Sequence, residues 1–178
     1  VVQAYANFAE QTGTRLTFFV NGMYADSWIP AAATLAPLIA SGQVQIANHT
    51  FGHPSLLNLS DAEIQDELMQ NHEFILNTFG VDARPYFRPP FGERDARTDA
   101  AAAAVGYTVP VMWYGSLGDS GWLDHGVLMG EADKWLQPAH IVLGHANAAP
   151  VTELFPQLLD LLASRGLVTV TLNDVFIR

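Results

Sequence analysis

The sequence predicts an α/β protein in which parallel strands form an open sheet or a barrel. Six short runs rich in β-branched and aromatic residues are predicted strands, and stretches of helical periodicity separate them. Strands that alternate with helices form right-handed βαβ units, which place the strands side by side and parallel. No linker, repeat or low-complexity segment divides the 178 residues, so residues 1–178 are predicted to form one domain.

The strands and helices are predicted from periodicity and from the residues that end each helix. The predicted strands are 16–20, 44–47, 86–88, 108–113, 140–144 and 167–172. The predicted helices are 1–13, 30–42, 60–80, 93–105, 124–137 and 151–165, with Gly42 as a helix end and Ser60 with Glu63 as a capping box. The helix-like stretch 1–13 stands before the first visible strand. In a β/α array a helix follows a strand, so we expect a first strand and its loop to precede Val1.

Composition and charge exclude several classes of function. Of all residues 49% are apolar and 15% are charged, which is typical of a globular protein, and no apolar run is long enough to span a membrane. The net charge of −10 argues against nucleic acid or an anionic membrane as the partner. The absence of cysteine excludes thiolate metal sites, disulfides and a cysteine nucleophile.

Polar side chains follow five successive predicted strands. They are Asn21, His49, Arg88, Asp119 and His145. In open α/β sheets and β/α barrels the carboxyl ends of the strands meet at one edge, where active sites are built. We therefore expect these five side chains to lie at the same edge.

The stretch "NHTFGHPSL" places His49 and His53 in a tight loop, because Gly52 and Pro54 disfavour a helix. Imidazole suits Zn²⁺ and similar ions, and catalytic zinc commonly has two His ligands, one carboxylate and an open position. The alternative is a pair of surface loop histidines. Their place after a strand favours the metal hypothesis.

Arg88 leaves its strand into two prolines, and Gly92 lets the backbone approach a ligand closely. An arginine so placed can hold a carboxylate or another anion through paired hydrogen bonds. The alternative is a surface arginine beside a rigid turn.

His145 follows an apolar strand and could act as a general acid that protonates a leaving amine or alkoxide. Asp119 could accept a hydrogen bond from its ring and stabilise the imidazolium, although "GDSG" also suits an ordinary turn. Trp122 is either a core residue or an exposed platform of the kind that binds sugars. His72 is expected beside the core, and His125 and His140 have no ligand-like neighbours.

Together these segments resemble the polysaccharide deacetylase family, carbohydrate esterase family four. The family includes chitin, chito-oligosaccharide, peptidoglycan and acetylxylan deacetylases. Five motifs in the family's order carry the resemblance, which are "RLTFFVNG" (15–22), "HTFGHP" (49–54), "RPPFG" (88–92), "IVLGH" (141–145) and "LVTVTLNDVF" (167–176). The resemblance implies a distorted seven-stranded β/α barrel, TIM-like, whose first strand is missing from this chain.

The resemblance also implies metal-dependent hydrolysis of an N-acetyl or O-acetyl group. A divalent metal, with Zn²⁺ as the default and Co²⁺, Mn²⁺ or Ni²⁺ as other candidates, would be held by His49, His53 and an Asp. A second Asp would act as the base on water, and the backbone N–H of Phe91 would hold the oxyanion with the metal. His145 would protonate the leaving group.

The remaining roles implied by the resemblance are supporting ones. Arg88 would orient the base Asp and Asp119 would tune His145. The residues expected to contact the substrate are Pro90, Phe91, Trp122 and Leu143. That substrate would be an acetylated polysaccharide or oligosaccharide, of the chitin or peptidoglycan type or else acetylxylan. By analogy with the family we expect a secreted or extracytoplasmic monomer.

Three departures separate this sequence from the family pattern. The family's Asp-Asp motif is absent, and its place lies upstream of Val1. Ser120 follows Asp119 where the family has Trp, and Ala146 follows His145 where Asp or Pro is frequent. Two alternatives therefore stay open. One is a non-catalytic carbohydrate-binding relative that lacks the Asp pair, and the other is an unrelated metal hydrolase that uses Asp119 or Glu93 as third ligand.

Overall fold

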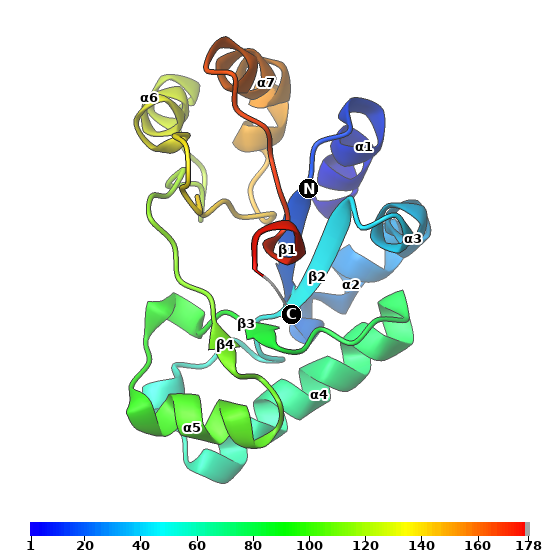
Figure 1. Ribbon diagram of the computed structural model, residues 1–178, viewed down its shortest axis with the longest axis vertical. Coiled ribbons are helices and arrows are strands. Elements are labelled where there is room, and N and C mark those ends of the chain that lie inside the picture. The colour runs from blue at the N-terminus through cyan, green and yellow to red at the C-terminus, as the bar shows by residue number, and fades with distance from the viewer. Residues whose placement is uncertain (177–178) are drawn as a thin grey trace.

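A four-stranded parallel sheet lies at the centre of the computed structural model, which describes residues 1–176. The strands, in spatial order, are β1 (Leu16–Val20), β2 (Val44–Asn48), β3 (Tyr86–Phe87) and β4 (Val109–Pro110) (Figure 1). The β1 and β2 strands pair along their whole length, whereas β3 and β4 contribute two residues each. The predicted α/β class with parallel strands is confirmed.

The helices are α1 (Val2–Thr12), α2 (Ala25–Trp28), α3 (Ala32–Ala40), α4 (Asp61–Phe79), α5 (Ala96–Ala104), α6 (His125–Trp135), α7 (Phe155–Ser164) and α8 (Leu172–Val175). Six of the helices correspond in order to the predicted ones, and α2 and α8 are additional. Short 3-10 turns are η1 (Gly22–Tyr24), η2 (Ile29–Ala31), η3 (Leu56–Asn58), η4 (Pro90–Gly92) and η5 (Pro150–Leu154). The capping box at the start of α4 is confirmed, because the Ser60 hydroxyl accepts from the Glu63 N–H and the Glu63 carboxylate accepts from the Ser60 N–H.

Two predicted strands are not regular strands in the structure. In segment 140–144, Leu143 forms an isolated parallel bridge with Ser116, supported by hydrogen bonds from Leu143 N–H to Gly115 O and from Leu117 N–H to Leu143 O, each 2.9 Å. The pairing is confined to these few residues because Gly115 and Gly118, which flank Ser116 and Leu117, both have positive φ and turn the chain away from an extended strand.

Segment 167–171 lies beside β1 without any backbone ladder. Its bonds are made by threonine hydroxyls instead, since Arg15 N–H donates to Thr169 Oγ1 (2.9 Å) and Leu172 N–H donates to Thr17 Oγ1 (3.2 Å). Val168 and Val170 are 82% and 50% exposed. The seven-stranded barrel is therefore not confirmed, and residues 1–176 hold four strands.

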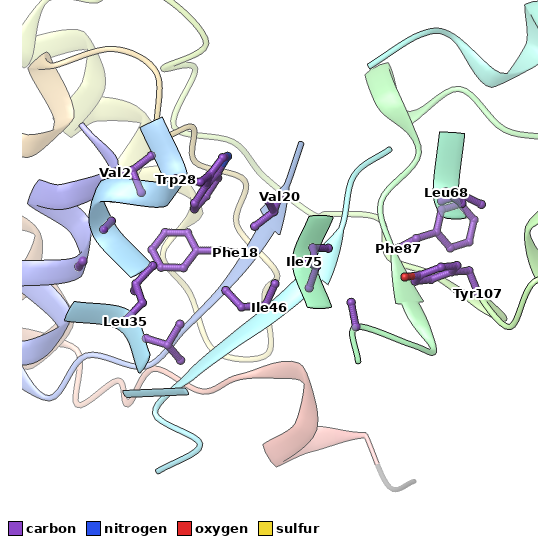
Figure 2. Close-up of a cluster of buried hydrophobic side chains, with 14 of the residues drawn as sticks. Val2, Phe18, Val20, Trp28, Leu35, Ile46, Leu68, Ile75, Phe87 and Tyr107 are labelled. Carbon is purple, nitrogen blue, oxygen red and sulfur yellow. The ribbon is translucent and has the colours of Figure 1, made fainter. Parts of the chain in front are cut away.

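Apolar side chains of the helices pack with Phe18, Val20 and Ile46 of the β1–β2 pair in one buried cluster (Figure 2). Phe18 of β1 meets Trp28 of α2 at 5.6 Å between ring centroids, in an edge-to-face arrangement. From α4 the same cluster receives Leu68 and Ile75, both fully buried. A second cluster joins α6 and α7, which lie side by side in Figure 1. This packing fixes the strand ends from which the polar loops leave.

Candidate active site

His49 follows β2 directly, and its ring is held in one tautomer. The Nδ1–H donates to the carbonyl oxygen of Arg88 at 2.7 Å, and the backbone N–H donates to Val20 O at 3.0 Å. Because a carbonyl only accepts, the proton stands on Nδ1 and the lone pair on Nε2. Burial is the main cause that lowers the pKa of His49 to about 3; the hydrogen bond to the Arg88 carbonyl opposes this shift, and the nearby His53, Arg88 and His145 add to it. The neutral ring is the form that binds a metal.

His53 lies beside His49, with 4.8 Å between the ring centroids. The loop reaches this geometry through two left-handed residues, Thr50 at φ 65° and His53 at φ 59°. The His53 N–H donates to Thr50 Oγ1 at 3.1 Å, which bridges the loop from inside. Partial burial lowers the pKa of His53, and the nearby His145 acts in the same direction.

Neighbouring side chains hold this loop from outside. The Asn21 amide donates to the carbonyl oxygens of His49 and Thr50, and the Glu67 carboxylate accepts from the Gly52 N–H at 2.7 Å. Asn21 was predicted at this edge, whereas Glu67 was not singled out in the sequence. Glu67 belongs to α4, and no local pattern distinguishes it from other polar residues of an amphipathic helix.

Arg88 is 7% exposed at the end of β3. Its N–H donates to Asn48 O at 2.8 Å, and its guanidinium lies 3.9 Å above the Phe19 ring and 5.7 Å from that of Trp113. Burial lowers its pKa to about 10. Within residues 1–176, no carboxylate forms an ion pair with Arg88. A buried cation without an acidic partner is costly.

Asp119 and His145 form a pair between two neighbouring loops. The His145 Nδ1–H donates to Asp119 Oδ1 at 3.0 Å, and the His145 backbone N–H donates to both carboxylate oxygens at 3.1 Å. Asp119 is 2% exposed, whereas a third of the His145 side chain is open to solvent. The predicted contact between these residues is present, and Asp119 does more than terminate a turn.

The four predicted substrate contacts differ in accessibility. Phe91 is 65% exposed, with its ring 4.7 Å from that of His53, and Trp122 is 79% exposed. Pro90 is buried, and Leu143, which forms the bridge with Ser116, is half-buried. Phe91 and Trp122 are therefore the two of this set that present large apolar surface to a ligand.

The third metal ligand is not found in the part of the chain that the structure describes, which holds no group of three His, Asp or Glu able to bind an ion. The Glu93 carboxylate accepts from the Ser55 hydroxyl, and Asp119 is engaged by His145. The structure does not bring Asp119 or Glu93 together with His49 and His53 into a three-ligand group within residues 1–176.

The remaining histidines have other partners. The His72 ring is within 3.0 Å of the Tyr107 hydroxyl in the core, as expected for a residue beside it. His125 Nε2 lies 3.1 Å from the Glu153 carboxylate, and His140 Nδ1–H donates to Trp135 O at 2.9 Å. None of these three belongs to the group formed by His49, His53 and His145.

Residues 1–110 match the family model described as polysaccharide deacetylase. Chitin deacetylase 1 of Cryptococcus neoformans var. grubii is 31% identical over 173 residues, which are 96% of this chain and 33% of that protein. The chain thus spans a third of the length of that relative.

Solved structures of the same family share the fold. The family 4 carbohydrate esterase from Streptomyces lividans superimposes with a TM-score of 0.82 at 24% identity, over 97% of this chain and 86% of that one. A family 4 pseudoenzyme from Bacillus anthracis also gives 0.82, at 20% identity, over 98% and 59%. The match over residues 1–110 exceeds half of the chain. The chain therefore belongs to the polysaccharide deacetylase family, carbohydrate esterase family four.

Proposed function

We propose that this protein removes acetyl groups from a polysaccharide by metal-dependent hydrolysis. The observation that carries the proposal is the meeting of two arrangements at one end of the sheet. His49 and His53 lie side by side with their rings edge to face, 4.8 Å between the centroids, and His145 is bonded to a buried carboxylate. Membership of the deacetylase family gives these arrangements their expected chemistry.

The two imidazole rings of His49 and His53 suit a divalent metal as two of its ligands. The Nδ1–H of His49 is fixed by a carbonyl, which orients the ring and leaves Nε2 as the ligand atom, in the way that metal-binding histidines are usually supported. Zn²⁺ is the default ion for two imidazoles and a carboxylate, and Co²⁺, Mn²⁺ or Ni²⁺ are further candidates. When bound, such an ion lowers the pKa of a water molecule and polarises the acetyl carbonyl.

His145 supplies the proton that the leaving group needs. Its Nδ1–H is held by Asp119, so the exchangeable proton of the imidazolium is the one on Nε2. Water gives one proton to the catalytic base as its oxygen bonds to the carbonyl carbon, and the bond from that carbon to the sugar nitrogen or oxygen then breaks as His145 protonates the departing atom. Acetate and the free amine or alcohol are the products.

One backbone N–H and two aromatic rings would position the substrate. The Phe91 N–H donates no hydrogen bond within residues 1–176, so it is free to hold the developing oxyanion. The exposed rings of Phe91 and Trp122 give a sugar two apolar faces to rest on. Pro90 and Leu143 would shape the floor of the same site.

The third ligand and the catalytic base come, in our proposal, from two Asp residues outside these 178. Arg88 supports it, because a buried guanidinium without an acid needs one, and the base would fill that role. β1 is an edge strand, and segment 167–171 beside it forms no backbone ladder with it, so a further strand could pair there. The seven-stranded barrel and its first strand are part of this proposal.

The substrate is proposed to be of the chitin or peptidoglycan type, with acetylxylan as the other choice. The similarity to a chitin deacetylase over 96% of the chain supports the first. No helix in residues 1–176 is long and apolar enough to cross a membrane. Action outside the cytoplasm, as a monomer and without a nucleic-acid partner, stays a prediction.

The direct experiment is zinc titration of the complete gene product, followed by an acetate assay on chitin oligosaccharides, peptidoglycan and acetylxylan. We expect binding of about one ion per chain and release of acetate from at least one substrate. A His49→Gln/His53→Gln variant should lose both. Zinc binding without acetate from any of the three would contradict the proposal.

A second candidate is a carbohydrate-binding protein without catalysis. The lack of a three-ligand group in the described residues favours it. It predicts that the complete gene product binds chitin oligosaccharides in calorimetry with or without zinc and releases no acetate. A Trp122→Ala change would weaken that binding, whereas His145→Gln would leave it unchanged.

A further inference from the structure

Asn71 reaches from α4 to the ends of β1 and β2, behind the histidine loop. Its side-chain NH₂ donates to the Val20 carbonyl oxygen at 2.7 Å and to Asn48 Oδ1 at 2.8 Å. Asn71 and Asn48 are both fully buried. One amide group of a helix is thus bonded to both β1 and β2 at the end from which the polar loops leave.

Each acceptor used by Asn71 also serves the histidine loop. The Val20 oxygen accepts from the His49 backbone N–H at 3.0 Å, and Asn48 Oδ1 accepts from the Thr50 N–H at 2.9 Å. Asn48 is itself oriented by its own NH₂, which donates to Leu68 O at 2.9 Å. The two N–H groups that open the loop therefore end on oxygens that Asn71 holds in place.

The backbone of the loop needs such support because Thr50 adopts a left-handed conformation that a β-branched residue rarely takes. Its hydroxyl accepts from the N–H of His53, which is also left-handed. The bond from Thr50 N–H to Asn48 Oδ1 thus holds Thr50 in place directly, and it holds His53 in place through the Thr50 hydroxyl. If Asn48 turned away, Thr50 could relax and His53 would lose its place beside His49.

The orientation of the Asn71 amide is fixed, because both of its partners are acceptors only. Its oxygen, in consequence, is the one buried side-chain polar atom in residues 1–176 without a hydrogen-bond partner. An unpaired buried oxygen costs stability. An isosteric leucine would avoid that cost, so stability of the core alone does not explain an asparagine here.

We propose that Asn71 is a positioning residue whose amide, through Val20 O and Asn48, sets the geometry of the His49–His53 pair without touching ligand. The inference rests on the proposed function only where it names metal binding as the property that depends on this geometry. Gly22 belongs to the same arrangement, since a Cβ there would lie 3.2 Å from Asn71 Oδ1 and 2.4 Å from the Phe51 ring.

The test compares Asn71→Leu with two control variants of the same helix. Asn77→Leu makes the same chemical change on an exposed asparagine, and Ile75→Ala destabilises the core without removing a donor to the loop. Should leucine prevent folding, Asn71→Ala removes the same donors with less bulk. Amide hydrogen exchange, followed by NMR, is measured with the Arg88 N–H as internal reference, because that group donates to the backbone oxygen of Asn48.

The expected result is exchange at the His49 and Thr50 amides that is about tenfold faster in Asn71→Leu, relative to Arg88. Zn²⁺ affinity in calorimetry should fall by a similar factor, about tenfold. Ile75→Ala should change exchange at all three amides together and leave the zinc affinity of the folded protein alone. Asn77→Leu should change neither quantity.

Unchanged relative exchange at His49 and Thr50 would overturn the inference, as would an equal fall in zinc affinity in Ile75→Ala. If the wild type binds no zinc, the proposed function fails separately. Selective exchange at the two amides would still support the positioning role of Asn71, and uniform exchange would still refute it.

Discussion

The His145 ring donates from Nδ1 to Asp119 Oδ1 across 3.0 Å, while the His145 backbone N–H donates to both oxygens of the same carboxylate. The carboxylate is therefore fixed relative to the backbone as well as the ring of its partner. Since Asp119 is 2% exposed, its charge acts on the ring with little screening by water. This arrangement suits a histidine that must hold a proton and then release it.

Asp119→Asn should lower kcat for deacetylation by about 100-fold or more, with little change in KM, because the imidazolium loses its stabilising charge. The asparagine oxygen can still accept from the His145 N–H groups, so the fold should survive. Steady-state acetate release on a chitin oligosaccharide measures the effect. An unchanged kcat would show that the pair is structural.

Trp122→Ala should raise KM for oligosaccharides by about threefold to tenfold, as expected for loss of one aromatic contact. The side chain is 79% exposed, so the melting temperature should not move. Trp122→Phe, which keeps an aromatic face, serves as the control and should retain most of the affinity. Equal KM values for wild type and Trp122→Ala would exclude the ring as a platform.

Arg88→Met should raise the unfolding free energy of the 178-residue chain by about 1 kcal/mol, because it removes a buried cation that lacks an acidic partner. Methionine retains much of the apolar contact with Phe19. Urea denaturation measures the change, and the exposed Arg94→Met should alter stability by less, about 0.5 kcal/mol at most. A clear loss of stability in Arg88→Met would mean that the contacts with Phe19 and Trp113 outweigh the cost of burial.

Stability in metal-free buffer should fall on acidification through the histidine pair. Burial depresses the pKa of His49 from 6.5 to about 3, so between these values the unfolded chain binds a proton that the folded chain does not. The contribution of the neutral ring is present above pH 6.5 and is lost as the pH falls toward 3. Wild type should therefore lose stability more steeply than His49→Gln, by up to about 1.4 kcal/mol per pH unit. Parallel curves for the two proteins in urea would contradict this.

The sequence allowed the placement of the site to be predicted because strand ends and loops are local features. His49, Arg88 and His145 each stand just after a run of β-forming residues, and parallel pairing brings such positions to one edge. The metal hypothesis for His49 and His53 came from the residues of a single loop. The sequence did not predict the tautomer of His49 or the left-handed conformation of Thr50, both of which depend on contacts that only the structure describes.

Other features depend on contacts between distant segments and were not predictable from sequence alone. In the sequence Asn71 cannot be told from the solvent-facing polar residues of α4. Only the packing of that helix against two strands makes its amide part of the site. The strand predicted at 167–172 has the right composition, yet a strand also needs a neighbour for its backbone. Thr169 and Thr17 supply side-chain bonds there instead of a ladder.

The most direct measurement of the central claim is acetate release from chitin oligosaccharides by the complete, zinc-loaded gene product, compared with its His145→Gln variant. We predict steady release by the wild type and a rate that is lower by about 100-fold or more in the variant. Zinc affinity should be unchanged, because His145 is not proposed as a metal ligand. Release at the same rate by both proteins, or no acetate from the wild type on any acetylated glycan, would contradict the account.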